Sequence, residues 1–186
     1  MRLIVGLGNP GPEFERTRHN LGALTVEKLR KRVGKRWQEN SQLSALILKF
    51  NPQTYLMFPQ TFMNRSGEAV EKAAERLKVK PEEIWVICDD ANLTVGRVRV
   101  RQGGEGGGHH GLQSIISRIG PNFWRIRIGI APERGKIQDL EKFVLEKTNP
   151  KEWQQLEKVV DKLVEKMVEW VTAGKIEPTT FNFIMD

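Results

Sequence analysis

Residues 2–11 of the chain read RLIVGLGNPG, an apolar and β-branched run that stops at glycine and proline. This pattern predicts a buried strand near the N-terminus. Further runs alternate along the chain, with strands expected at 43–50, 53–58, 84–88, 95–101 and 124–130 and helices at 20–33, 61–78 and 109–120. The alternation predicts a single-domain α/β fold, a three-layer α/β/α sandwich with a mixed, mostly parallel twisted sheet. Residues 124–130 are expected to be its last strand, and Thr61 is expected to cap the second helix.

The C-terminal part of the chain predicts an amphipathic helix at about 150–172, starting at Pro150. Its apolar residues recur at steps of three and four positions: Trp153, Leu156, Val159, Val160, Leu163, Val164, Met167 and Val171. Two segments before it lack such periodicity, a glycine-rich loop at about 102–109 and a segment at about 132–149. We expect the loop to be flexible, because glycine tolerates many backbone conformations, and the second segment to be a mobile lid.

Length, charge and cysteine content indicate the number of domains, the kind of partner and the compartment to expect. The 186 residues suit one domain, and 30 Lys and Arg against 23 Asp and Glu give a net charge of +7, which favours a polyanionic partner. Cys88 is the single cysteine, so no intrachain disulfide can form and a reducing compartment is expected. No apolar run has the length of a signal peptide or a membrane span. We therefore expect a cytoplasmic protein with no membrane partner.

The glycines of residues 6–11 match the G-x-G-x-x-G pattern of a dinucleotide-binding turn. Pro10 and Pro12, however, remove amide donors that such a turn would direct at a pyrophosphate. The acidic residue expected about twenty positions later is Glu27, which falls inside the predicted first helix rather than at a strand end. The sequence therefore argues against a dinucleotide site, and the loop is expected to position Asn9 instead.

Polar residues stand at predicted strand ends and helix starts, and four short motifs contain or flank them: GLGNPG at 6–11, TRHN at 17–20, TFMN at 61–64 and GGGHHGL at 106–112. In their order and spacing, with Asp89 after a predicted strand, the chain resembles the bacterial peptidyl-tRNA hydrolase family over essentially its whole length. The resemblance implies one catalytic domain spanning residues 1–186. It would cleave the ester between the peptide and the 3′-terminal ribose of peptidyl-tRNA and release tRNA for reuse in translation.

The resemblance also implies the catalytic roles. His19 matches the general base that activates water, and Asp89 matches the acid that orients this histidine. Asn9 matches the asparagine beside the attacked carbonyl, where an amide can donate to an oxyanion or hold the water. No cofactor is implied, and the three histidines and one cysteine show no metal-ligand spacing, so no metal site is expected.

Four further residues are expected to bind the substrate: Phe14, Met63, Asn64 and His110. Two of them depart from the family pattern. His110 stands where the family usually has asparagine, and it can still donate and accept hydrogen bonds. Phe14 stands where tyrosine is common, which keeps an apolar wall and loses a hydroxyl.

Alternating arginines predict where RNA binds. Arg97, Arg99 and Arg101 share one face of a strand because side chains two positions apart point the same way, and Arg125 and Arg127 repeat the alternation on the next strand. Guanidinium groups match phosphate oxygens in bidentate geometry. The resemblance implies that Arg101 and Arg127 clamp the tRNA 5′ phosphate, and Arg99 is expected to add to this contact with the acceptor stem and CCA end.

Several alternatives stay open from the sequence alone. A lysine stripe on the last helix (Lys158, Lys162 and Lys166) fits either tRNA or an ordinary solvated face, and the glycine-rich loop fits either a gate or a phosphate nest. Taken singly, each site residue also fits a cap, a turn or a packed side chain. The rival functions are a non-catalytic RNA-binding protein of the same fold, as in intron splicing, and an esterase or amidase for small substrates. We expect a monomer.

Overall fold

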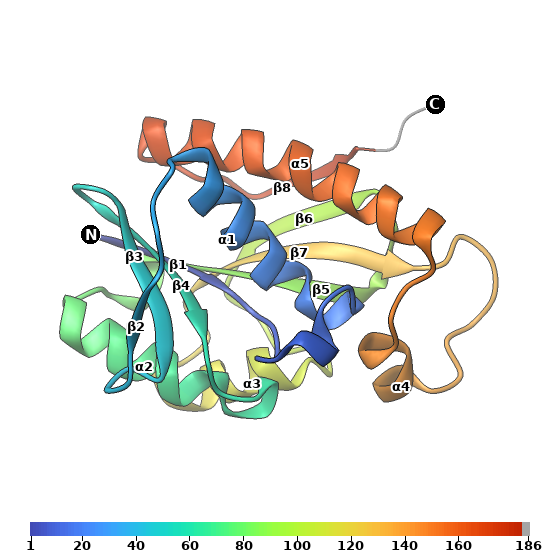
Figure 1. The fold of residues 1–186 in the computed structure, drawn as a ribbon, viewed down its shortest axis with the longest axis horizontal. Helices are drawn as coiled ribbons and strands as arrows, with labels where there is room; N and C mark the ends of the chain where they lie inside the picture. The colour runs from blue at the N-terminus through green and yellow to red at the C-terminus, as the bar shows by residue number, and fades with distance from the viewer. Residues whose placement is uncertain (184–186) are drawn as a thin grey trace.

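The computed structural model describes residues 1–183, and its centre is one eight-stranded sheet with helices on both faces (Figure 1). The strands are β1 (Arg2–Gly6), β2 (Gln38–Asn40), β3 (Ala45–Asn51), β4 (Thr54–Pro59), β5 (Ile84–Thr94), β6 (Arg97–Gln102), β7 (Trp124–Ala131) and β8 (Thr179–Asn182). They lie in the order β2-β3-β4-β1-β5-β7-β6-β8. The central strands are parallel, with β1 between β4 and β5 and with β5 next to β7. The remaining pairs on either side are antiparallel, so the predicted α/β fold with a mixed sheet is confirmed.

The helices form the two outer layers. They are α1 (Leu21–Arg32), α2 (Ser66–Leu77), α3 (His110–Ile119), α4 (Leu140–Leu145) and α5 (Pro150–Ala173). α1 and α5 lie on one face of the sheet and α2 and α3 on the other (Figure 1). Alternating residues of β1 serve both layers: Ile4 packs with the α1 and α5 side chains, whereas Leu3 and Val5 pack with those of α2 and α3. The predicted buried strand thus lies between two cores.

Helix α1 packs unusually close to the sheet, which places the segment before it. A Cβ atom on Gly22 would lie 2.2 Å from the carbonyl oxygen of Ile87 and 2.5 Å from the amide nitrogen of Leu7, so only glycine fits there. The amide of Ala23 donates to the carbonyl of Leu7 at 2.9 Å. This contact holds the short 3₁₀ turn η2 (Arg18–Asn20), and with it His19, beside the ends of β1 and the middle of β5.

Two boundary predictions are wrong. Residues 124–130 are not the last strand, because β8 pairs with β6 at the sheet edge, and its short sequence TTFN lacks a run of apolar residues. Helix α2 begins at Ser66 instead of after Thr61. The amide of Met63 donates to Asn9 Oδ1 at 2.8 Å and the chain is still extended at Phe62, so the helix starts only after the 3₁₀ turn η3 (Met63–Arg65).

The structure also adds elements that the hydrophobic pattern did not predict. These are the edge strand β2, the helix α4 inside the segment 132–149, and the extension of β5 from residue 88 to Thr94. The predicted C-terminal helix is confirmed as α5, and its predicted apolar residues are all buried. Among residues 1–183, no helix is both long enough and apolar enough to span a membrane.

Candidate active site

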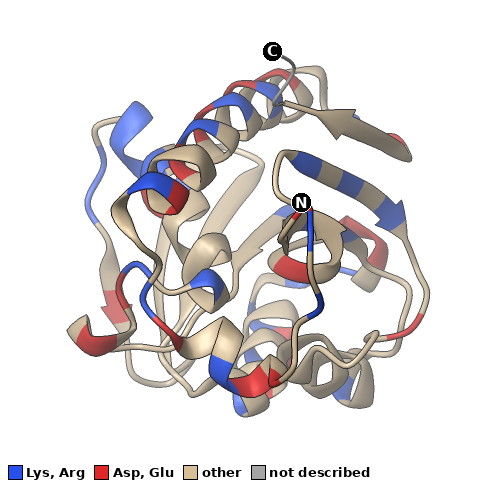
Figure 2. Ribbon diagram, turned by 90° about the vertical axis from the view of Figure 1, so that its right-hand side faces the viewer, with Lys and Arg blue, Asp and Glu red and all other residues tan. Residues whose placement is uncertain are grey.

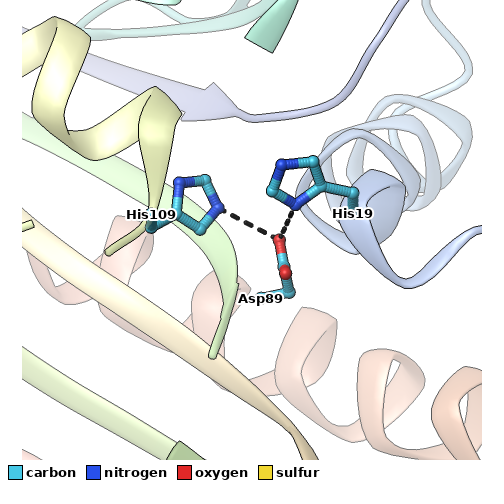
Figure 3. A group of neighbouring side chains, drawn as sticks. All are labelled: His19, Asp89 and His109. Atoms are coloured by element: carbon cyan, nitrogen blue, oxygen red, sulfur yellow. Dashed lines mark hydrogen bonds and ion pairs between the residues drawn. The ribbon is translucent and has the colours of Figure 1, made fainter. Parts of the chain in front are cut away.

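Two histidine rings hydrogen-bond the same carboxylate oxygen of Asp89, at the point where β1 has ended and β5 continues. His19 Nδ1 lies 2.8 Å from Asp89 Oδ1, and His109 Nε2 lies 3.1 Å from the same oxygen (Figure 3). The last residue pair between β1 and β5 is Gly6 with Ile87, so Asp89 projects just beyond the paired region. His19 comes from η2 and His109 from the start of α3, so three separate segments build the cluster.

Hydrogen bonding assigns different tautomers to the two neutral imidazoles. An ionised carboxylate only accepts, so the nitrogen of each ring that faces Asp89 carries the proton. For His19 this nitrogen is Nδ1, which leaves Nε2 with a free lone pair. For His109 it is Nε2, while Nδ1 accepts from the amide of Leu112 at 3.3 Å and caps helix α3. His19 therefore keeps a nitrogen that can take a proton from a ligand.

Asp89 stays ionised in this setting. Its side chain is 3% exposed, and burial alone would raise its pKa. The positive charge that His109 and His19 can carry, together with their hydrogen bonds, outweighs burial and holds the pKa of Asp89 well below its usual range. The carboxylate can therefore accept from both rings and stabilise a proton on His19.

Asn9 is fixed beside the cluster by three hydrogen bonds. Its amide donates to Asn20 Oδ1 and its carbonyl accepts from Asn20 Nδ2, both at 2.9 Å. Its side-chain oxygen accepts from the amide of Met63. Because this oxygen is engaged, the Nδ2 group is what the side chain can offer to a ligand. The loop after β1 thus positions Asn9, as predicted.

A cavity of about 760 Å³ opens over these residues. Its lining includes all the predicted catalytic and substrate-binding residues: Asn9, Phe14, His19, Met63, Asn64, Asp89 and His110. One wall is apolar, with Phe62 packed edge-to-face against Phe14 and with Leu140, Val144 and Leu145 contributed by α4 and its end. The cavity therefore combines a titratable cluster with an apolar wall, as ligand sites commonly do.

The arginines divide into two groups. Arg99 and Arg101 are exposed on β6 outside the cavity, and alternating blue and tan bands along one strand in Figure 2 show the pattern. Arg127 lies opposite Arg99 on β7 and lines the cavity, where it contacts Asp90 Oδ2 at 3.3 Å and the carbonyl of Glu105 at 2.8 Å. Cross-strand partners share a face, so a continuous arginine surface leads from β6 to the cavity.

Arg125 does not repeat the exposed pattern, contrary to the sequence-based expectation. It is 1% exposed, and its guanidinium donates to the carbonyls of Gly104 and Pro121. Burial lowers the pKa of Arg125 to about 10, and the neighbouring charge of Arg127 acts in the same direction. The side chain of Arg125 holds the glycine-rich loop against β7 and presents no surface charge.

The structure also bears on two other kinds of site, a metal site and a cysteine nucleophile. His19, Asp89 and His109 offer atoms within 4.8 Å of one another, a grouping that could hold a metal. Ligand atoms around a tetrahedral zinc ion lie roughly 3.3 to 3.6 Å apart, whereas both nitrogens are closer than that to Asp89 Oδ1, at hydrogen-bond distances. Burial strongly raises the pKa of the Cys88 thiol, which removes it as a nucleophile at neutral pH.

Comparisons with known proteins give one consistent result. A protein-family model described as "Peptidyl-tRNA hydrolase" matches residues 3–184. The chain belongs to this family. The peptidyl-tRNA hydrolase of Rhodospirillum centenum is 43% identical over 166 residues, covering 88% of this chain and 73% of that protein. That of Desulfitobacterium hafniense is 37% identical, covering 94% and 95%. A crystal structure of the Acinetobacter baumannii enzyme superposes with a TM-score of 0.86 at 35% identity, covering 94% of this chain and 89% of the other.

Family membership confirms the resemblance found in the sequence. The structure brings the predicted catalytic and substrate-binding residues and Arg127 together around one cavity, whereas Arg99 and Arg101 lie outside it. The roles of the individual residues stay predictions. His109 is the member of the cluster that sequence reasoning missed. The sequence predicts a helix that starts near His109 and shows no metal-ligand spacing, but it assigns this histidine no place in the site; its position directly after the glycine run is typical of a helix cap.

The opposite tautomers can be tested directly. In ¹⁵N-labelled protein at a pH where both imidazoles are neutral, long-range ¹H–¹⁵N NMR should show His19 protonated on Nδ1 and His109 on Nε2. The His19→Ala and His110→Ala variants assign the signals. The same tautomer at both positions would contradict the shared hydrogen bonding to Asp89.

Proposed function

We propose that the chain hydrolyses the ester between the peptide and the 3′-terminal ribose of peptidyl-tRNA, with His19 as the general base. One observation carries the assignment: the His19 ring is held by Asp89 through Nδ1, so its Nε2 is free at the cavity that Asn9 and Asn64 also line. An ester needs an activated water, a proton acceptor and a donor for the oxyanion, and the cavity offers groups for each.

The reaction follows from these groups. His19 Nε2 takes a proton from water as its oxygen attacks the ester carbonyl carbon, and Asp89 stabilises the imidazolium that forms. Asn9 Nδ2 donates to the oxyanion or to the attacking water. The tetrahedral intermediate collapses by breaking the bond to the ribose 3′ oxygen, and the imidazolium returns its proton to that oxygen. The products are the free peptide acid and tRNA with a 3′ hydroxyl.

His109 supports this arrangement in our proposal without touching the ester. Its Nε2 donates to the oxygen of Asp89 that also accepts from His19, so the carboxylate is held from two sides. Because its Nδ1 accepts from the amide of Leu112, the position of α3 sets the ring. His109 therefore acts through Asp89.

The two sides of the cavity suit the two parts of the substrate. Phe14, Met63, Asn64 and His110 would bind the region around the ester, and the apolar wall of Phe62 and α4 would contact the peptide. The exposed Arg99 and Arg101 would bind backbone phosphates of the acceptor stem, and Arg127 would contact the 5′ phosphate where the arginine surface reaches the cavity. The CCA end would then lead into the site.

The remaining expectations complete the proposal. The enzyme acts as a single catalytic domain and a monomer in the cytoplasm, without metal or cofactor. The glycine-rich loop at about 102–109 and the segment 132–149 gate the cavity. The rival of a non-catalytic RNA-binding protein gives no reason for a histidine base fixed by a buried carboxylate. An esterase for small substrates gives no reason for the arginine surface beside the cavity.

The base assignment is tested with His19→Ala. This variant should lower kcat for a peptidyl-tRNA by at least about 100-fold, because it removes the proton acceptor, while the melting temperature and tRNA binding are retained. A folded His19→Ala protein with a near-normal rate would rule the assignment out. Tight RNA binding by the unchanged chain without any ester cleavage would instead favour the non-catalytic rival.

The arginine surface is tested through salt. Arg101→Gln should weaken tRNA binding and reduce the slope of log Kd against log salt concentration by roughly 0.7 to 0.9, the value of one lost phosphate contact. Arg36→Gln is the matched control, since Arg36 is an exposed arginine just before β2, at the opposite edge of the sheet. An unchanged slope for Arg101→Gln, or an equal change for Arg36→Gln, would show that Arg101 does not contact phosphate.

A further inference from the structure

Arg18, the residue before His19, is a buried charge with an unusually complete set of partners. It is 7% exposed, and arginine is rarely buried unless it is paired. Its Nε and one terminal nitrogen bind the two carboxylate oxygens of Glu152, each at 2.7 Å. Its other terminal nitrogen donates to the carbonyl of Phe143 at 2.7 Å, and the guanidinium carbon lies 3.8 Å from the centre of the Phe143 ring.

These partners belong to two helices that are distant in sequence from Arg18. Phe143 lies in α4, and Glu152 lies in the first turn of α5. One guanidinium therefore joins the turn that carries His19 to both helices. The backbone continues the same contact: the amide of Thr148 donates to the carbonyl of Arg16 at 3.1 Å, and Thr17 pairs with Lys147 as an antiparallel bridge.

Helix α4 needs such an anchor. It supplies Leu140, Val144 and its last residue, Leu145, to the apolar cavity wall. Leu140 is 44% exposed, and nearly all residues from 132 to 142 are exposed, so few packing contacts fix the segment. Figure 1 shows α4 and the long connection before it at the side of the molecule, attached next to the start of α5.

We propose that Arg18 is a positioning residue that anchors α4, the C-terminal part of the gating segment, as the substrate-binding wall beside His19, so that the residues before α4 carry the gating motion; this inference rests on the proposed function. Arg18 does not itself line the cavity, so it acts through α4. The role requires arginine, because lysine cannot bind both oxygens of Glu152 and the Phe143 carbonyl in one planar arrangement. Orientation of His19 is left to Asp89.

The first test separates binding from chemistry. Arg18→Lys should raise KM for peptidyl-tRNA about tenfold and change kcat by less than about twofold, because the wall is displaced and the base is not. Glu152→Gln should act in the same direction with a smaller effect. Asp161→Asn is the matched control: Asp161 is also an α5 carboxylate paired with a cation of the N-terminal region, Lys28 at 2.6 Å, away from α4. It should leave both constants unchanged.

Two further experiments test the proposal, one by proteolysis and one by a disulfide that should restore the position of α4. Trypsin should cut the segment 132–149 faster in Arg18→Lys than in the unchanged chain or in Asp161→Asn. In addition, the hydrogen bond between Arg16 and Thr148 flanks the antiparallel pair Thr17 and Lys147, which makes Thr17 and Lys147 a non-hydrogen-bonded and therefore close pair suited to a disulfide. Oxidised Thr17→Cys/Lys147→Cys in the Arg18→Lys background should restore KM, and reduction should remove the rescue.

The outcomes are distinct. A fall in kcat with unchanged KM would overturn the proposal, because Arg18 would then act on His19. A lower melting temperature with unchanged kinetics and unchanged trypsin cleavage would also overturn it, since the role would be structural only. If the unchanged chain does not cleave peptidyl-tRNA, the proposed function fails, and the trypsin comparison still decides whether Arg18 holds α4.

Discussion

The site depends on one carboxylate oxygen. Asp89 Oδ1 accepts from His19 and from His109, and this pair of hydrogen bonds fixes which nitrogen of each ring is free. The arrangement requires that β5 carries Asp89 past the end of β1, that η2 holds His19 next to it, and that α3 starts at His109. The close packing of Gly22 against the sheet therefore helps to place His19, and the cap that His109 provides for α3 helps to place the His109 ring.

The two histidines explain why this buried carboxylate keeps its charge. A buried carboxylate without partners would protonate, and it would then lose its capacity to stabilise a charged imidazole. The two histidines reverse that tendency, so the charge is retained inside the protein. Two buried arginines also have hydrogen-bond partners near the cavity: Arg18 pairs with Glu152 in α5, and Arg125 donates to the carbonyl of Gly104 in the glycine-rich loop. Charged side chains thus tie the glycine-rich loop and the start of α5 to the scaffold around the site.

The sequence predicted those features that depend on local pattern. Apolar runs and helical periodicity gave the sheet and α5, and the ordered motifs gave the family and the residues that line the cavity. What it missed depends on tertiary contacts. The edge strand β8 is defined by its pairing with β6, the start of α2 by the bond between Asn9 and Met63, and the burial of Arg125 by the loop that covers it. His109 was missed because no motif or local pattern indicates that its ring reaches Asp89, whereas the pairing of His19 with Asp89, 70 residues apart, was expected from the family resemblance.

The central claim is that the charge of Asp89 makes His19 an effective base, and one measurement tests it most directly. The single-turnover rate constant of Asp89→Asn should be compared with that of the unchanged chain at saturating peptidyl-tRNA. Asparagine keeps the size of the side chain and removes its charge, so the rate constant should fall by at least about 100-fold while the Kd for the substrate changes little. A folded variant with a near-normal rate constant would contradict the account.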